Sequence, residues 1–142
     1  MTEDSRRITA ELNGLYERLL GMAALVEARL QAVMQAFVSR DGERLTEIVR
    51  TDARIDALQI EIDELCFRLI ALHQPVAVDL RMIVSVLKMN ADLERVGDLA
   101  VSIGKAGRRY IRHPPVKPLL DLPRMGELAL RMLRESIEAL VT

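Results

Sequence analysis

Apolar side chains recur at every third or fourth residue along almost the whole chain, a spacing typical of amphipathic helices packed against one another. It predicts a first helix over about 3–39, a second over about 43–72 and a third ending near residue 111. Only four of the 142 residues are Phe or Tyr and none is Trp, so the core must consist of aliphatic side chains and Met. We therefore expect an all-α protein, in which an antiparallel, up-down-up three-helix bundle is followed by one further helix.

Prolines divide the chain. Pro75 ends the second helix and suits the first turn of the third. Residues 113–118 include three prolines within five positions, which forbids a helix there. Asp121 suits the cap of a fourth helix, whose apolar pattern repeats that of the first. We expect a three-helix unit over 1–112, a proline-rich linker over 113–120 and the first helix of an incomplete second unit over 121–142.

Charge and cysteine content exclude several classes of protein. The 20 Lys and Arg balance 21 Asp and Glu, and a net charge of -1 with few aromatic residues argues against nucleic-acid binding. The single cysteine, Cys66, cannot form an internal disulfide and favours a reducing cytoplasm; we read it as a small buried hydrophobe. No apolar run approaches the roughly 20 residues that span a bilayer. We expect a cytoplasmic protein, peripheral to a membrane at most through its partners.

Two pairs of carboxylates stand out because each pair shares a helix face. Glu94 and Asp98 lie four residues apart on a stripe that is otherwise apolar, where an unpaired charge is costly. Asp52 and Asp56 repeat the spacing on the second predicted helix. The other members of the third-helix stripe, which we expect to face the core, are Leu80, Val84, Leu87, Ala91 and Val101.

An antiparallel turn at Pro75 would pair residues whose numbers sum to about 150. Asp52 then lies level with Asp98, and Asp56 level with Glu94. Four converging carboxylates require protonation, neutralisation by Arg or a metal cation. Ligation by oxygen alone favours hard ions such as Mg²⁺, Mn²⁺ or iron. The alternative is a solvated acidic face that binds no metal.

Two motifs at this separation resemble the PhoU family of phosphate-uptake regulators: residues 74–81, QPVAVDLR, and residues 92–98, DLERVGD. The resemblance implies tandem three-helix bundles of spectrin-repeat-like topology. It also implies E(D)xxxD motifs that bind multinuclear metal clusters. Carried onto this sequence, these motifs are Asp52/Asp56 and Glu94/Asp98, and the metal is iron, manganese, magnesium or zinc. The sequence departs from the family in lacking the two acidic helices of a second bundle.

The resemblance implies a non-enzymatic regulator of phosphate homeostasis. Such a protein represses the phosphate-starvation response through the phosphate-specific ABC transporter and a phosphate-sensing histidine kinase. The competing hypotheses are a carboxylate-bridged metalloenzyme, hydrolase or oxidase, and a metal-free helical interaction module; the lack of His ligands weighs against the enzyme. The apolar stripe of residues 121–142 predicts a homodimer, with docking of this helix onto its own bundle as the alternative.

Overall fold

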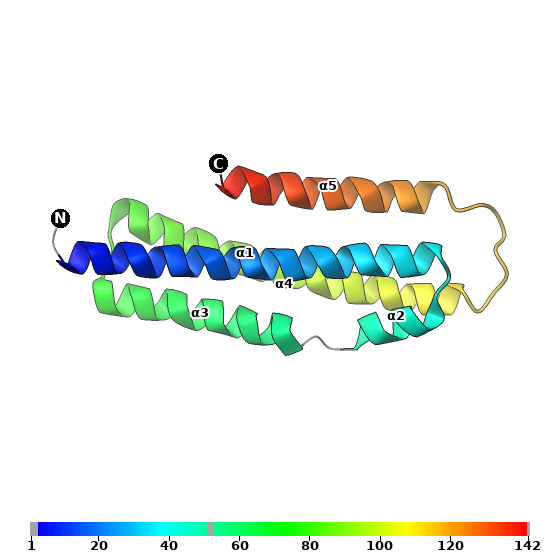
Figure 1. Cartoon of the computed structure of the whole chain (residues 1–142), viewed down its shortest axis with the longest axis horizontal. Coiled ribbons are helices and arrows are strands. Elements are labelled where there is room, and N and C mark those ends of the chain that lie inside the picture. Colours follow the sequence, from blue (N-terminus) through cyan, green and yellow to red (C-terminus); the bar gives the residue numbers. More distant parts are fainter. Residues whose placement is uncertain (1–2, 51–52, 142) are drawn as a thin grey trace. The chain divides into compact units, whose positions relative to one another are not determined.

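Five helices and no strand make up the part of the chain that the computed structural model describes, residues 3–50 and 53–141 (Figure 1). They are α1 (Glu3–Val38), α2 (Gly42–Val49), α3 (Ala53–His73), α4 (Ala77–Tyr110) and α5 (Asp121–Val141). The expected all-α helical bundle is confirmed. None of the described helices is both long enough and apolar enough to cross a membrane.

The chain divides into two compact units, and the two long helices contribute to both. Unit 1 comprises residues 1–23 and 53–94, and unit 2 comprises 24–52 and 95–142. Residues 121–142 therefore belong to the same unit as parts of the predicted 1–112 domain. The assignment of 1–112 and 121–142 to successive repeats stays a prediction.

In unit 1, α3 runs antiparallel to the first halves of α1 and α4. Arg18 of α1 donates a 2.5 Å hydrogen bond to Glu61 of α3, and Asn90 of α4 bonds the backbone of Gln59 in α3. The core lies between these helices because their apolar stripes face inward. Its largest fully buried members are Leu15, Leu19, Met22, Ile62, Leu69, Ile83 and Val86.

The prediction of which residues of α4 face the core is wrong. Leu80 and Val84 are more than a third exposed, and Asp98 is exposed as well. The expectation relied on large apolar residues, whereas much of the real core face is made of small ones. Its buried positions form a heptad pattern of Ile83, Val86, Asn90, Leu93, Gly97, Ala100, Gly104 and Gly107.

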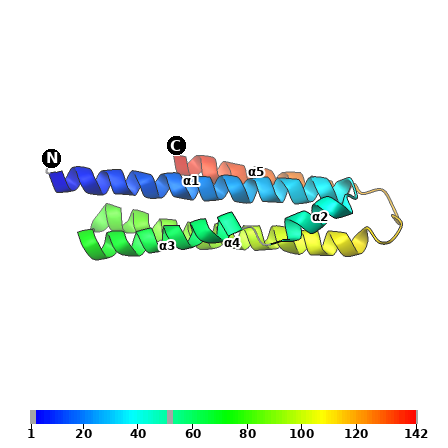
Figure 2. The ribbon, with the colours of Figure 1, turned by 60° about the horizontal axis from the view of Figure 1, so that its bottom comes forward.

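Two of these glycines allow close helix packing in unit 2. A Cβ on Gly104 would lie 2.9 Å from Val49 of α2, and a Cβ on Gly107 would lie 2.8 Å from the ring of Phe37 in α1. α2 therefore packs against both α1 and the second half of α4 (Figure 2). Leu45 of α2 is completely buried there. Any larger side chain at either glycine would force these helices apart.

The single helix expected over 43–72 is also wrong, because α2 ends at Val49. Arg50 is extended, with φ −64° and ψ 143°. Arg29 of α1 donates hydrogen bonds to the carbonyls of Ile48 at 3.1 Å and Arg50 at 2.9 Å, which satisfies acceptors at the end of α2. The apolar face of α3 is buried at Ile55, Ile62, Leu65 and Leu69, whereas Leu72 in the last turn is 67% exposed.

The turn between α3 and α4 also differs in detail from the expectation. α4 begins at Ala77, so Pro75 precedes the helix instead of occupying its first turn. Gln74 and Ala77 adopt left-handed backbone angles, with φ of 43° and 50°. The reversal of direction thus depends on two non-glycine residues in an uncommon conformation around the proline.

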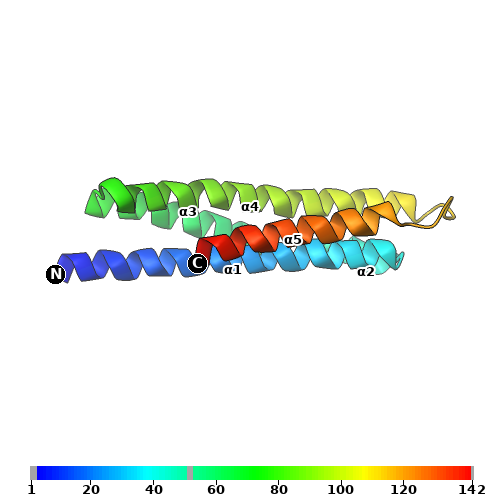
Figure 3. The same cartoon turned by 90° about the horizontal axis from the view of Figure 1, so that it is seen from above.

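In unit 2, α5 runs antiparallel to the second half of α1 (Figure 3). Gly126 of α5 lies against Met34, where a Cβ would be 2.5 Å from the methionine methyl group. Arg134, two turns further on, pairs with Glu27. The single chain thus adopts the alternative in which the last helix docks onto its own bundle. Self-association stays a prediction.

Candidate functional site

The four carboxylates predicted as metal ligands have different positions in the structure. Asp52 lies outside the described residues. Asp56 is exposed in the first turn of α3, and Glu94 is half-buried on α4. Asp98 is exposed one turn beyond Glu94 but belongs to unit 2. The premise that both acids interrupt the buried face of α4 is therefore wrong: Glu94 lies at the border of that face, between Asn90 and Gly97, and Asp98 points to solvent.

The pairing of α3 with α4 does follow the expected register in unit 1. The Nδ2 of Asn90 donates a 2.9 Å hydrogen bond to the carbonyl oxygen of Gln59, and these residue numbers sum to about 150. Asp56 and Glu94 have the same sum, so antiparallel pairing puts them at the same level of the two helices. This is the part of the predicted constellation for which the register supplies support.

The donor chemistry suits a hard cation, but the described ligand set is incomplete. Carboxylate oxygens are the preferred ligands of Mg²⁺, Mn²⁺ and Ca²⁺. Within residues 3–50 and 53–141, no ion pair neutralises Asp56, Glu94 or Asp98. No group of three or more potential ligand side chains forms there either. The four-ligand site therefore stays a prediction.

A buried polar cluster in unit 1 escaped the sequence analysis. Asn90 is completely buried, and its Nδ2 also donates a 2.9 Å hydrogen bond to Oδ1 of Asp63. The Nε2 of Gln59 donates to the other carboxylate oxygen of Asp63 at 3.4 Å. Asp63 is thus half-buried and hydrogen-bonded. Asn90 and Gln59 also have residue numbers that sum to about 150, but both are uncharged, and the sequence analysis searched for paired charges.

Cys66 lies one turn beyond Asp63 on α3 and is completely buried. Burial, with a smaller contribution from the negative charge of Asp63, raises the pKa of the Cys66 thiol to about 11. The thiol is therefore protonated at neutral pH, which removes its value as a nucleophile or metal ligand. The expected role as a small buried hydrophobe is confirmed.

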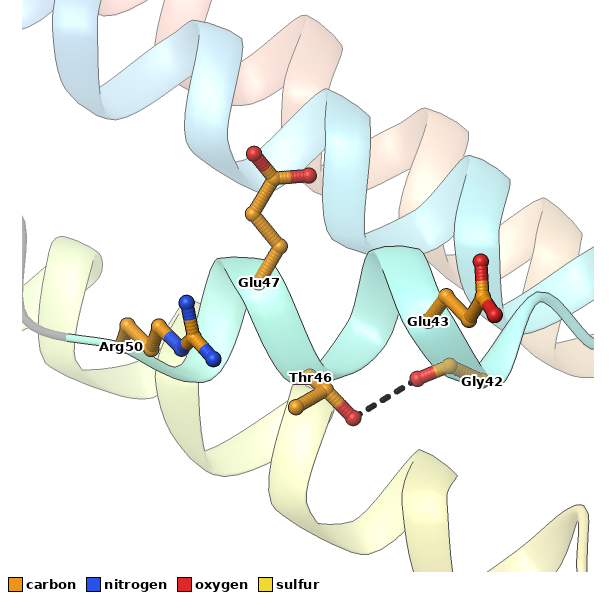
Figure 4. Close-up of a pocket in the computed structure, with 5 residues that line it drawn as sticks. All are labelled: Gly42, Glu43, Thr46, Glu47 and Arg50. Atoms are coloured by element: carbon orange, nitrogen blue, oxygen red, sulfur yellow. Dashed lines mark hydrogen bonds between the residues drawn. The ribbon is translucent and has the colours of Figure 1, made fainter.

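The surface of unit 2 also has concave features. An open surface hollow of about 680 Å³ lies along α2, lined by Glu43, Glu47 and Arg50 among others (Figure 4). Thr46 contributes little reactivity to it, because its hydroxyl donates a 2.8 Å hydrogen bond to the carbonyl of Gly42. A second, almost wholly apolar cavity of about 390 Å³ lies between α1, α4 and α5, against Phe37 and Met125. Neither has the converging polar groups of a catalytic site.

Together these features define an all-helical bundle protein with a carboxylate-bearing helix surface. Residues 19–106 match the PhoU domain. The chain is 38% identical over 133 residues to the phosphate-specific transport system accessory protein PhoU homolog of Caulobacter vibrioides, which covers 93% of this chain and 58% of the relative. The corresponding homolog of Aquifex aeolicus is 34% identical, with 92% and 59% covered. PhoU of Escherichia coli is 30% identical, with 95% and 56% covered.

The chain therefore belongs to the PhoU family. It spans less than three fifths of the length of these relatives.

Proposed function

We propose that this chain acts as an accessory protein of phosphate-specific transport and restrains the phosphate-starvation response when phosphate is plentiful. The observation that carries the proposal is its similarity, along more than nine tenths of its length, to proteins named as accessory to that transport system. Its partners in this role are the phosphate-specific ABC transporter and a phosphate-sensing histidine kinase. The role is regulatory, not enzymatic, and is exerted in the cytoplasm.

The proposed metal site comprises Asp52, Asp56, Glu94 and Asp98. Support comes from the matched level of Asp56 and Glu94 in unit 1 and from the absence of neutralising ion pairs at the described members of the set. When bound, the ion would supply positive charge to which an oxyanion such as phosphate can bind. The four carboxylates would hold it. We further propose that two copies associate through the exposed side of α5.

A carboxylate-bridged metalloenzyme is the weaker proposal. Cys66 is a buried, protonated thiol, and His73 lies against Glu11, with Nε2 3.4 Å from the carboxylate. Both are thus occupied in the packing of unit 1. In the described chain, neither joins Asp56 or Glu94 in a ligand group.

The test uses a bacterial strain that lacks its own PhoU protein and carries a reporter of the phosphate-starvation response. Expression of this chain is expected to silence the reporter in phosphate-rich medium. The double variant Glu94→Gln, Asp98→Asn is expected to leave it active. Its matched control, Glu64→Gln with Asp92→Asn, removes two exposed acids elsewhere and is expected to behave like the wild type. A reporter that stays active although the wild-type protein accumulates would contradict the proposal.

A further inference from the structure

Positive charge is concentrated in one segment of an otherwise balanced chain. Residues 99–120 contain five Lys or Arg and no Asp or Glu, although the whole chain has a net charge of -1. The segment covers the last part of α4 and the linker to α5, all within unit 2. The flanking acids are Asp98 before it and Asp121 after it. Such segregation creates a local positive field that the net charge conceals.

The helical part of this segment presents its charges on one face. On α4, Lys105, Arg108 and Arg109 follow the spacing i, i+3 and i+4, which aligns them along one side of the helix, and Arg112 follows in the turn after α4 ends at Tyr110. The buried Gly104 and Gly107, which face α1 and α2, lie next to Arg108 and on the side away from Arg109. Lys105, Arg109 and Arg112 are exposed, and Arg108 is half-buried. The result is a basic stripe that faces away from the core of unit 2.

The linker adds exposed aliphatic side chains next to this stripe. Val116 is 95% exposed and Leu120 is 75% exposed, and Lys117 lies between them. Pro114, Pro115 and Pro118 have no backbone N–H, so this stretch has fewer donors to satisfy when it leaves water. The linker projects beyond the ends of α4 and α5 in all three views (Figure 1).

Arg40 holds the linker in place at its beginning. Its Nη2 donates a 2.9 Å hydrogen bond to the carbonyl oxygen of Ile111 and a second bond to that of His113. Its guanidinium group also lies over the ring of Tyr110, 5.5 Å from the centroid. The exposed residues beyond His113 are therefore carried by an anchored segment, and the ring of Tyr110 is engaged within unit 2.

We propose that the end of α4 and the linker, residues 105–120, dock directly onto an anionic phospholipid surface. The basic stripe contacts headgroup phosphates, and Val116 and Leu120 enter the interfacial region, as amphipathic anchors do. An acidic protein would pair with the basic stripe alone, whereas a membrane also buries the exposed aliphatic side chains of Val116 and Leu120. The engagement of Tyr110 by Arg40 removes the nearby aromatic ring on which the bases of a single-stranded nucleic acid could stack. The proposal is independent of any role in phosphate transport.

The test is co-sedimentation of the full chain with two kinds of vesicle. One contains phosphatidylcholine only, and the other contains two thirds phosphatidylcholine and one third phosphatidylglycerol. We expect binding to the anionic vesicles alone, with release as salt is raised. Each basic residue contributes about fivefold to such binding. The triple variant Lys105→Glu, Arg109→Glu, Arg112→Glu should therefore bind at least about 100-fold more weakly, and Val116→Ser with Leu120→Ser should also weaken binding.

The matched control reverses three exposed charges outside the segment: Arg68→Glu, Arg81→Glu and Lys88→Glu. It has the same net charge as the triple variant and is expected to retain most of the binding. Circular dichroism checks that every variant keeps its helices. Equal losses in the two triple variants would overturn the proposal, as would equal binding to both vesicles. A wild-type chain that binds neither vesicle would also overturn it and leave an acidic protein as the partner for the stripe.

Discussion

The side-chain amide of Asn90 donates a 2.9 Å hydrogen bond to the carboxylate of Asp63, across the interface between α3 and α4. Asn90 occupies a core position in the heptad pattern of α4 and is completely buried. A polar side chain at such a position specifies register, because a shift along the partner helix would leave the amide without its acceptors. The pairing of α3 with α4 in unit 1 is thus fixed by polar bonds as well as by apolar packing.

Asn90→Ala should lower the free energy of unfolding by about 1–3 kcal/mol, since it leaves a cavity and removes both donated hydrogen bonds. Asn90→Leu should cost less, because it fills the space. Urea denaturation followed by circular dichroism measures both. Ser85→Ala on the exposed side of α4 is the control, and an alanine variant at Asn90 as stable as this control would contradict the register role.

Gly107→Ala should destabilise the protein by about 1–3 kcal/mol, because its Cβ would lie 2.8 Å from the ring of Phe37. Gly21→Ala offers the opposite case. Its Cβ would meet only the end of Leu58, at 3.9 Å, so the gain in helix propensity should stabilise the protein by up to about 1 kcal/mol. Thermal melts of the two variants should therefore shift in opposite directions; shifts of the same sign would refute the packing assigned to Gly107.

Stability should fall at alkaline pH through Cys66. Burial raises the pKa of its thiol from 9.0 to about 11, so between these values the unfolded chain ionises while the folded chain does not. The stabilisation is complete below about pH 9 and is lost as pH rises through 11, with a total of about 3 kcal/mol. Unfolding free energies at pH 8 and pH 11 should therefore differ more for the wild type than for Cys66→Ala. If the wild type and Cys66→Ala lose the same unfolding free energy between pH 8 and pH 11, the raised pKa of the Cys66 thiol is contradicted.

If the carboxylates hold a metal, chelation should lower the melting temperature, because a ligand of the native state stabilises it by mass action. Glu94→Gln combined with Asp98→Asn should remove the response to chelator, and elemental analysis should show the loss of metal. The control pair, Glu64→Gln with Asp92→Asn, should still respond. A chelator response that persists in the first pair would place the metal elsewhere.

Self-association through α5 should depend on its exposed side. Met132 is 68% exposed and Met125 is 62% exposed, whereas Leu133 packs against the core of unit 2. Met132→Glu should therefore abolish the dimer without unfolding the chain, and Leu133→Glu should lower stability itself. Sedimentation at micromolar concentration measures this, and a wild-type chain that remains a single 16.0 kDa species would exclude the dimer.

The sequence predicted those elements whose apolar residues are large and regularly spaced. α1 ends one residue from its expected boundary, and α5 covers the expected range. The core face of α4 was missed because Gly97, Gly104 and Gly107 have no side chain, so a search for large apolar residues does not find the positions where helices pack closely. The end of α2 was missed because the hydrogen bonds that satisfy its carbonyls come from Arg29, about 20 positions away.

For the candidate site, the register of α3 and α4 could be predicted from the turn at Pro75, and so could the matched level of Asp56 and Glu94. Their environment could not, because it depends on which side of α4 packs inward. The Asn90 cluster was equally hidden, since an uncharged amide becomes informative only once its burial is known.

The short connection between α3 and α4 has a consequence for the order of folding. Only three residues separate these helices, whereas the contacts of α1 with Gly104 and Gly107 in unit 2 join positions about 70 residues apart. Nearby segments close their loops at a lower entropic cost, so the α3–α4 hairpin should form first. During synthesis, α1 leaves the ribosome first, but the part of it that packs against Gly104 and Gly107 stays accessible to chaperones until the end of α4 has emerged.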